Sequence, residues 1–355
     1  MFTRLLLGAF LAGGAFGTGA AVLLQSASLQ AAPAPHGPSA ARDGLAALKA
    51  MFRRPAAVPF PADNPFSEKK RALGEVLFHD RRLSIDNSRS CASCHDRAKG
   101  FADGKAQGEG VPGRPLKRHT PTLWNLAWSA PVFWDGRARS LEEQVAGPIE
   151  SPDEMAQPMA SVIARLSADD AMRRAFAEAF PQAPKVDAAN LAKAIATFER
   201  TVVSGYAPFD AWVDGDESAI SDSAKRGFAL FNGKANCAAC HTGWNFTDNK
   251  FHDIGTNGTD IGRGKIEPNN PKAQFAFKTP GLRDITQRAP FMHDGSLPDL
   301  EAVMARYITG GIERPSISPQ FRKIELDANE IADVIEFLKT LTGTKQVVSL
   351  PVLPN

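Results

Sequence analysis

The pentapeptide Cys91-Ala92-Ser93-Cys94-His95 recurs as Cys237-Ala238-Ala239-Cys240-His241, 146 residues later in a chain of 355 residues. The sequence contains four cysteines, and all four belong to these two pentapeptides. Small secreted proteins are often stabilised by many disulfide bonds, but four cysteines are too few to stabilise a chain of this length in that way. The two pentapeptides themselves must therefore explain the cysteines.

Each Cys-x-x-Cys-His motif is typical of covalent haem c attachment. The two thiols lie one helical turn apart and add to the vinyl groups of the porphyrin, and the adjacent histidine meets the iron. A zinc site would be strained, because each histidine directly follows its second cysteine. Redox-active disulfides accompany a thioredoxin-like βαβ pattern, which is absent. The motifs predict two covalently bound haem c groups, with His95 and His241 as iron ligands and the thioethers on Cys91, Cys94, Cys237 and Cys240.

The sequence around the motifs is duplicated as well. The segment Gly-Glu-Val-Leu-Phe at residues 74–78 precedes the first motif, and Gly-Phe-Ala-Leu-Phe at residues 227–231 precedes the second. A second block follows at a constant offset of 159, since the pattern of Thr-Pro, Leu, Ala-Pro, Asp-Gly and Leu-Glu in residues 120–142 reappears in residues 279–301. The duplication predicts two related domains.

Helical periodicity dominates both halves. Apolar residues recur at helical steps within residues 191–202 and 331–338, and convincing alternating strands are absent. We expect a mostly α fold of two tandem cytochrome c-like domains, each with one covalent haem. The N-terminal, peroxidatic domain is expected over residues 63–215 and the C-terminal, electron-transfer domain over residues 216–345.

The N-terminus has the pattern of an export signal. Arg4 precedes an apolar run over residues 5–24, and the polar, small residues 25–28 follow it. Residues 1–28 are therefore predicted to be a signal peptide or a retained N-terminal anchor. Either alternative places the remaining chain in the periplasm, in contact with the membrane only if the segment is retained. Residues 29–62, rich in alanine and proline, are predicted to be a tether that packs little.

The overall charge is nearly balanced. The chain has 41 Lys and Arg against 39 Asp and Glu, a formal net charge of +2. Such a balance argues against binding nucleic acid through bulk charge. A hydrophobic content of 43% is ordinary for a globular protein and suffices for buried cores.

The duplication also bears on the sixth iron ligands. At the 159-residue offset, Tyr307 corresponds to Pro148. Proline cannot bind iron, whereas tyrosine can bind it as a phenolate. We therefore expect an open distal face on the first haem and Tyr307 on the second. Met292 and Met304 are the competing sixth ligands, because His/Met is a common cytochrome pair.

These residues resemble the di-haem bacterial cytochrome c peroxidase superfamily, and more closely its methylamine-utilisation, MauG-like branch. The resemblance covers roughly residues 64–344. It rests on both Cys-x-x-Cys-His motifs and on the segments 120–123, 133–138, 141–144, 147–149, 154–155 and 289–295, with Tyr307 and Gly310-Gly311.

The resemblance implies a role for each matching residue. His95 would hold the haem that reacts with hydrogen peroxide, and His241 the electron-transfer haem. Trp134 would lie between the two haems as the electron bridge. Glu154 matches the distal acid–base carboxylate, and Gln144 matches its distal companion. From the residues alone, Trp134 could also be a core aromatic and Glu154 a solvated carboxylate or a helix cap.

Three positions depart from the peroxidases. The histidine that blocks their first haem until the enzyme is reduced is replaced by Val111, and their methionine is replaced by Tyr307, as in the MauG-like branch. The resemblance also implies an inter-domain calcium with Pro290 at a backbone ligand. The asparagine that supplies a calcium oxygen is His119 in this chain, and a neutral imidazole is a poor calcium ligand, so calcium is in doubt.

Three functions fit these features to different degrees. The first is a MauG-like oxidoreductase that reacts with hydrogen peroxide and oxidises a protein partner through the second haem. The second is a plain cytochrome c peroxidase that draws electrons from a small cytochrome or copper protein. The third is a non-catalytic di-haem electron carrier, which needs neither an open iron nor a distal acid. Pro148, Val111 and Glu154 therefore weigh against the carrier.

Overall fold

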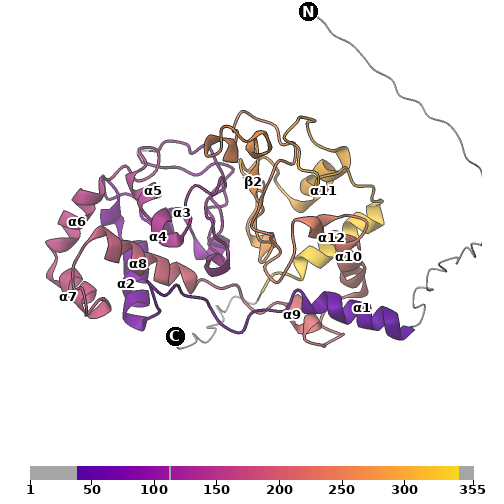
Figure 1. The fold of residues 1–355 in the computed structure, drawn as a ribbon, viewed down its shortest axis with the longest axis horizontal. Helices are drawn as coiled ribbons and strands as arrows, with labels where there is room; N and C mark the ends of the chain where they lie inside the picture. The colour runs from indigo at the N-terminus through magenta and orange to yellow at the C-terminus, as the bar shows by residue number, and fades with distance from the viewer. Residues whose placement is uncertain (1–37, 112, 344–355) are drawn as a thin grey trace, which may run out of the picture. The chain divides into compact units, whose positions relative to one another are not determined.

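The chain folds into short helices joined by long loops, and the computed structural model describes residues 38–111 and 113–343. Within those ranges, no helix is both long and apolar enough to cross a bilayer. Residues 1–28, predicted as a signal or an anchor, lie outside the described residues. The helices and strands of Figure 1 are α1 (Pro38–Ala50), α2 (Glu68–His79), α3 (Cys91–Cys94), α4 (Leu141–Gln144), α5 (Ala146–Glu150), α6 (Met159–Ser167), α7 (Asp170–Ala179), α8 (Ala188–Arg200), α9 (Pro208–Val213), α10 (Asp222–Asn232), β1 (Phe251–His252), β2 (Phe277–Lys278), α11 (Leu300–Thr309) and α12 (Ala328–Lys339).

Side-chain caps fix where the longer helices begin. Ser67 Oγ accepts the N–H of Lys70 at 3.1 Å at the start of α2, and Asp187 accepts the N–H of Asn190 at 2.8 Å at the start of α8. Such caps satisfy backbone donors that have no partner within the helix. Helices α8 and α12 coincide closely with the two periodic segments, so the helices predicted there are confirmed.

The two halves of the chain repeat one close helix crossing. Helix α2 packs on α8 in the first half, and α10 packs on α12 in the second. A Cβ on Gly74 would lie 2.0 Å from the carbonyl oxygen of Ala194, and a Cβ on Gly227 would lie 1.9 Å from that of Asp333. Each glycine is therefore required because a backbone carbonyl occupies the place of a side chain. The duplication seen in the sequence is confirmed by this equivalent packing.

The second duplicated block also repeats its backbone geometry. Phe133 and its counterpart Met292 both have positive φ, 70° and 75°, although positive φ is uncommon for such residues. Gly136 and its counterpart Gly295 follow with φ of 67° and 65°. These turns place the segments after Thr120 and Thr279 in equivalent positions in the two halves.

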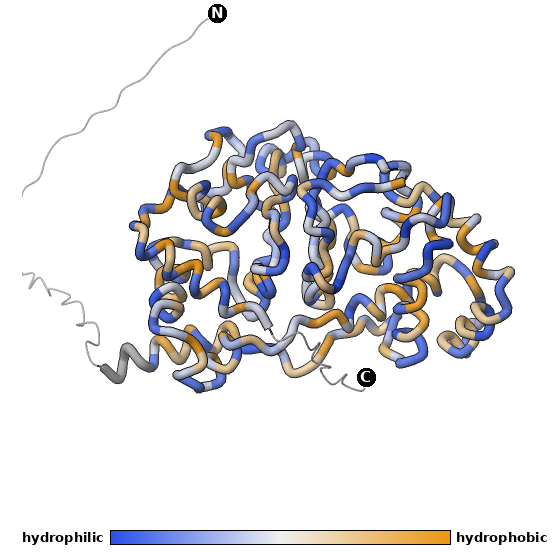
Figure 2. The backbone as a smooth tube through the Cα atoms, turned by 180° about the vertical axis from the view of Figure 1, so that it is seen from behind, coloured by the Kyte–Doolittle hydropathy of each residue, from blue (hydrophilic) through white to orange (hydrophobic). Residues whose placement is uncertain are grey.

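Each half has its own hydrophobic core. Hydrophilic and hydrophobic stretches are interspersed along the backbone of both halves in Figure 2. The first core is mostly aliphatic, with Leu77, Val162, Leu166, Phe176 and Leu191 fully buried. The second is mostly aromatic; Phe228 lies 5.5 Å from Phe209 and 5.4 Å from Phe337, measured between ring centroids. The two halves of the chain therefore fold around separate hydrophobic cores.

The segment before α2 packs more tightly than its composition suggests. Phe52 is completely buried in the second core, with its ring centroid 5.0 Å from that of Phe246. Val58 is buried, and Lys49 forms a 2.8 Å ion pair with Glu217. The prediction that residues 29–62 pack little is therefore wrong for this part of the segment. Alanine and proline dominate its composition, but a single aromatic residue is enough to anchor it.

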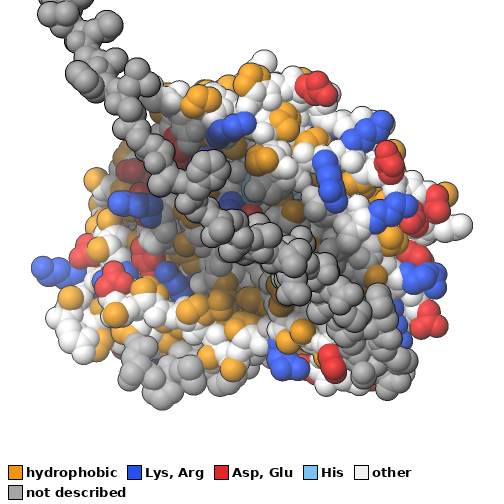
Figure 3. Space-filling model, turned by 45° about the vertical axis from the view of Figure 1, so that its right-hand side comes forward, with side chains coloured by type: hydrophobic (Ala, Val, Ile, Leu, Met, Phe, Trp, Pro, Cys, Tyr) orange, Lys and Arg blue, Asp and Glu red, His pale blue; other side chains and the backbone are white. Residues whose placement is uncertain are grey.

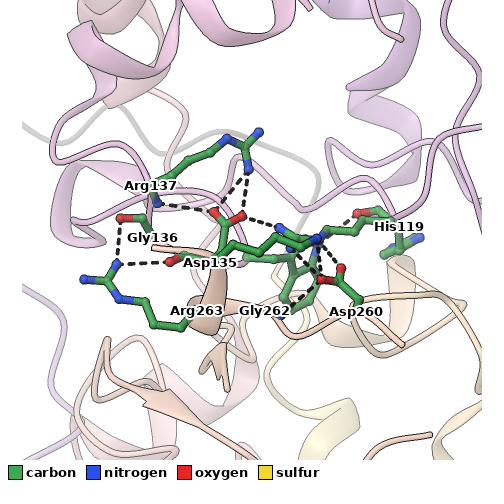
Figure 4. A network of polar contacts seen from close by, with 10 residues as sticks. His119, Asp135, Gly136, Arg137, Asp260, Gly262 and Arg263 are labelled. Carbon is green, nitrogen blue, oxygen red and sulfur yellow. Dashed lines mark hydrogen bonds and ion pairs between the residues drawn. The ribbon is translucent and has the colours of Figure 1, made fainter. Parts of the chain in front are cut away.

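Ion pairs join the two halves where their loops meet (Figure 4). Arg118 lies 2.7 Å from Asp135 and 2.7 Å from Asp260, which follows the second motif. Arg263, in the second half, donates hydrogen bonds to the carbonyl oxygens of Asp135 and Gly136 in the first half, at 3.0 and 2.9 Å. Over the face in Figure 3, basic and acidic side chains are interspersed, in keeping with the small net charge.

Candidate functional site

A cavity of about 710 Å³ lies between the two halves and is lined by both Cys-x-x-Cys-His motifs. The side chains selected from the sequence all contribute to its lining: Cys91, Cys94, His95, Trp134, Gln144, Glu154, Cys237, Cys240, His241, Met292, Met304 and Tyr307. Pro148, His119 and Pro290 also line it, whereas Val111 does not. The structure therefore brings residues from distant parts of the chain to one place.

Both motif histidines are oriented by the same kind of contact. Nδ1 of His95 lies 2.9 Å from the carbonyl oxygen of Phe101, and Nδ1 of His241 lies 2.9 Å from that of Phe246. Both phenylalanines have positive φ, 55° and 54°, which turns their carbonyls toward the imidazoles. A proton on Nδ1 donates to the carbonyl and leaves Nε2 free to bind a metal. These carbonyl contacts were not predicted from the sequence, although a Phe-x-Asp pattern follows each motif and contains the phenylalanine that supplies the carbonyl.

The protonation states of the motif residues suit a haem c site. Burial lowers the pKa of His95 and of His241, which keeps both imidazoles neutral, the form that binds iron. Burial also raises the pKa of Cys91, and it raises the pKa of Cys237 to about 12. In the first motif, α3 forms one helical turn that separates the two cysteines. The donor set therefore fits covalently attached haem.

Glu154 lies on the first-half side of the cavity. Its backbone N–H donates to Ser151 at 3.1 Å, and its carbonyl accepts the N–H of Val111 at 2.8 Å. Burial raises the pKa of the Glu154 carboxyl, and the positive charge of Arg137 opposes this in part. A carboxyl with a raised pKa holds a proton more readily than an ordinary surface carboxylate, which suits an acid–base group.

Gln144 and Pro148 lie on two short helices and line the same cavity as Glu154. Ser140 Oγ accepts the N–H of Glu143 at 3.1 Å and begins α4, which ends at Gln144. Pro148 lies within α5 and has no group that could bind a metal. Leu141 is buried and fixes α4 on the core. The first-half face of the cavity therefore combines a carboxyl, an amide and a non-ligating residue.

Trp134 is held where the halves meet. Its indole Nε1 donates to the carbonyl of His119 at 2.9 Å, and its own carbonyl accepts the N–H of Lys278 at 2.8 Å. The N–H of His119 in turn donates to the carbonyl of His293 at 2.8 Å. Hydrogen bonds from both halves thus fix the indole in the cavity wall.

The side chain of His119 forms a hydrogen bond to the protein backbone. Its Nδ1 lies 2.7 Å from the carbonyl oxygen of Lys105. Burial lowers the pKa of His119, so the imidazole is neutral. Calcium prefers carboxylate, amide and carbonyl oxygens, and a neutral imidazole offers none. The residue present therefore does not fit the side-chain ligand position of a calcium site.

Tyr307 faces the cavity from α11. Its ring centroid lies 5.8 Å from that of Phe321, and among the described residues its hydroxyl has no hydrogen-bond partner. Burial raises the pKa of Tyr307, and negative charge on the nearby Cys237 and Cys240 thiols would raise it further. The hydroxyl is thus close to the second motif and free to contact a group bound there.

The two methionines occupy different environments. Met304 lies one turn before Tyr307 on α11 and is buried in the second hydrophobic core. Met292 sits in the positive-φ turn and is only partly buried. Both reach the cavity lining.

One group of potential metal ligands was not expected from the sequence. Donor atoms of Cys240, Asp248 and His252 lie within 4.8 Å of one another. His252 Nε2 lies 2.8 Å from Asp248, and this hydrogen bond raises the pKa of His252 to about 9, while its Nδ1 lies 2.8 Å from Ser318 Oγ. A thioether at Cys240 would leave two donors, which form an ion pair rather than a metal site.

Several buried polar groups in the cavity wall were not predicted from the sequence either. Glu199 on α8 is buried and its Oε2 has no hydrogen-bond partner, and burial raises its pKa to about 8. The indole nitrogen of Trp124 and Nε of Arg288 are buried without a partner as well. Buried polar atoms normally find partners, so these groups indicate that the cavity is built around a polar-edged ligand.

Comparison with known proteins agrees with this geometry. Residues 68–218 match the family model described as di-haem cytochrome c peroxidase, and residues 224–342 match the model described as cytochrome c. The chain is 50% identical to the methylamine utilization protein MauG of Methylorubrum extorquens, over 89% of this chain and 90% of that protein. It is 44% identical to the MauG of Methylophilus methylotrophus, over 86% of this chain and 91% of that protein.

A solved structure shares the fold. A MauG-like protein associated with microbial copper homeostasis superposes with a TM-score of 0.76 and 32% identity, covering 84% of this chain and 97% of that one. The fold is accordingly two tandem cytochrome c-type domains, and the relatives are haem oxidoreductases. On these likenesses and on the shared cavity, the chain belongs to the di-haem cytochrome c peroxidase family.

Proposed function

We propose that this protein is an exported, MauG-like oxidoreductase that holds two covalent haem c groups, reduces hydrogen peroxide at the first and oxidises a protein partner through the second. The observation that carries the proposal is the single cavity that joins both Cys-x-x-Cys-His motifs with Trp134, Glu154 and Tyr307. Export to the periplasm follows from the charged and apolar pattern of residues 1–28.

The chain's own residues define the two haem positions. Cys91 and Cys94 would carry the first haem with His95 as iron ligand, and the second motif would do the same. Haem c, when bound, supplies an iron that exchanges electrons with peroxide and with a redox partner. The Phe101 and Phe246 carbonyls keep the motif imidazoles in the tautomer that binds iron.

Glu154 is proposed as the proton carrier for peroxide. Its raised pKa lets the carboxylate take a proton from one peroxide oxygen and return it to the other, which leaves as water. Gln144 supplies an amide on the same face to orient the peroxide. Pro148 at the position equivalent to Tyr307 leaves room for peroxide on the first-half side.

Trp134 is proposed as the bridge between the two domains. An oxidisable side chain between two redox centres divides one long electron transfer into two shorter ones. The indole N–H bond to His119 and the backbone bond to Lys278 hold the ring in the wall shared by both motifs. Tyr307 is proposed as the second-domain iron ligand.

Two features favour a MauG-like reaction over a plain cytochrome c peroxidase. Val111 is buried outside the cavity lining and cannot block an iron. A phenolate at Tyr307 would favour oxidised iron more than a thioether would. A non-catalytic electron carrier would have no use for the buried carboxyl of Glu154.

Calcium is not part of the proposed mechanism. His119 does not offer an oxygen ligand, and its Nδ1 is bonded to Lys105. The boundary already contains a protein cation, Arg118, between Asp135 and Asp260. Treatment with a chelator is expected to leave the absorption spectrum and the peroxide reaction unchanged.

Mixing the as-isolated ferric protein with one equivalent of peroxide tests the proposal. Haem content is first counted by the pyridine haemochrome assay and by intact mass, where two covalent haems are expected. Stopped-flow spectra should then change without prior reduction, and the product should accept electrons from a protein donor. Inertness until one electron is added would favour the plain peroxidase, and two low-spin haems unresponsive to peroxide would favour the electron carrier.

A further inference from the structure

Arg288 crosses from the second domain to the first inside the wall of the cavity. It is 7% exposed and lines the cavity that contains both motifs. A Cβ on Gly100, five residues after His95, would lie 2.7 Å from Cγ of Arg288. The arginine therefore occupies space that only a glycine leaves free beside the first motif.

The charge of Arg288 has little compensation within the protein. Its Nη2 donates to the carbonyl of Gly281 at 2.6 Å, while its Nε is buried without a partner. In the part of the chain that the structure describes, no carboxylate oxygen lies within 4.0 Å of its guanidinium. Burial lowers the pKa of Arg288 to about 10, and the more distant charge of Asp284 opposes this only in part. A buried cation without a partner is strongly unfavourable.

We propose that Arg288 binds a propionate carboxylate of the haem attached at Cys91 and Cys94. This inference rests on the proposed haem content. Propionates are the anionic groups of a haem, and a guanidinium fork matches a carboxylate in shape and charge. The bond would satisfy the Nε donor and neutralise the buried charge together.

Two contacts favour the first haem over the second. The Arg288 side chain packs on Gly100, and Phe101, the next residue, gives the carbonyl that orients His95. Trp124 packs on Phe101 with ring centroids 4.8 Å apart, and its indole N–H is also buried in the cavity wall without an acceptor. Two unpartnered donors thus adjoin one loop of the first motif, and Trp124 would supply a second hydrogen bond to the same propionate edge.

Arg288→Gln and Arg288→Met in the holoprotein test the inference. Methionine has a similar length and no charge, and replacing a buried ion by an apolar residue is often tolerated by the fold. Both variants should keep two haems, lower the reduction potential of the first haem and shift its propionate bending bands in resonance Raman spectra. Arg288→Lys should retain more of the potential but still shift the bands, because an ammonium lacks the planar fork.

The matched control is Arg263→Met. Arg263 lies at the same boundary and donates to backbone carbonyls, but it does not line the cavity. Its variant should leave both potentials and the propionate bands unchanged. Parental bands and potentials in Arg288→Met carrying two haems would overturn the inference, and so would changes confined to the second haem. A chain with fewer than two haems would instead contradict the proposed haem content.

Discussion

Arg118 in the first domain and Asp260 in the second form an ion pair with Nε and Oδ2 2.7 Å apart. The same guanidinium lies 2.7 Å from Asp135, and Lys265 lies 2.7 Å from Asp260. Four charged groups thus alternate in sign across the boundary between the domains. Because Asp135 directly follows Trp134, this network also fixes the backbone that presents the indole to both motifs.

Asp260→Asn should destabilise the folded protein by about 2–3 kcal/mol, because it leaves the largely buried Arg118 with one carboxylate in place of two. Urea unfolding followed by circular dichroism measures the change. Glu143→Gln is the control, since the Arg139–Glu143 pair is exposed and exposed pairs contribute little to the free energy of unfolding. Equal losses in the two variants would show that the boundary pair has no special role.

Gly227→Ala should destabilise the protein by about 1–3 kcal/mol, because a methyl group there would meet the carbonyl of Asp333 and push α10 away from α12. Gly74→Ala should do the same at the α2–α8 crossing. Thermal unfolding monitored by calorimetry measures both effects. Gly44→Ala, where an added Cβ has nothing within 4 Å, should be neutral or slightly stabilising. Normal stability of Gly227→Ala would contradict the close crossing.

Glu154→Gln should slow the peroxide reaction by about 10²–10⁴-fold, the usual contribution of a positioned acid–base group. The amide keeps the shape of the side chain but cannot carry the proton. Stopped-flow absorbance at varied peroxide measures the rate, and both haems should remain bound. Glu313→Gln, at an exposed carboxylate outside the cavity lining, is the control. Unchanged peroxide kinetics in Glu154→Gln would remove this residue from the mechanism.

Tyr307→Met should raise the reduction potential of the second haem, because a thioether favours reduced iron more than an anionic phenolate does. The variant should shift toward ordinary cytochrome c peroxidase behaviour, including a need for prior reduction. Spectroelectrochemistry and near-infrared magnetic circular dichroism measure the potential and the ligand. Met292→Leu and Met304→Leu should keep the parental ligand signature. A methionine signature in the parent protein would contradict the assignment of Tyr307.

Glu142 should make part of the stability dependent on acid pH. Burial would raise its pKa, but hydrogen bonds from Arg200 and Asn64 outweigh burial and lower the pKa of Glu142 to about 2. A carboxyl with a lowered folded-state pKa binds fewer protons when folded. Its contribution is at most about 3 kcal/mol, because solvent screens this partly buried carboxyl; it is complete above about pH 5 and is lost as pH falls toward 2.

Glu142→Gln tests this pH dependence. The free energy of unfolding of the variant should be lower at neutral pH and should change less between pH 5 and 2 than that of the parent. Urea titrations at several pH values measure the difference. Glu313→Gln, at an exposed position, should follow the parental curve. Parallel curves for parent and Glu142→Gln would contradict the contribution of Glu142.

Local patterns in the sequence were sufficient to predict haem c attachment, the duplication and the helical class of this protein. These properties are recorded in local spacing: Cys-x-x-Cys-His is one turn followed by a ligand, and apolar residues at helical steps specify helices wherever they pack. The glycines of the repeated Gly-x-x-x-Phe segments are local too, but only the structure shows that a carbonyl of another helix touches each one.

Features that depend on contacts between distant residues became visible only in the folded chain. The carbonyls that orient His95 and His241, the burial of Phe52 in the second core and the unpartnered guanidinium of Arg288 carry little or no signature in their neighbouring residues. Their effects come from desolvation and from donor–acceptor geometry, which exist only after the chain closes loops of tens to hundreds of residues. For that reason the sequence named the candidate ligands of the site, whereas the fold determined their tautomers, their charges and the polar wall that surrounds them.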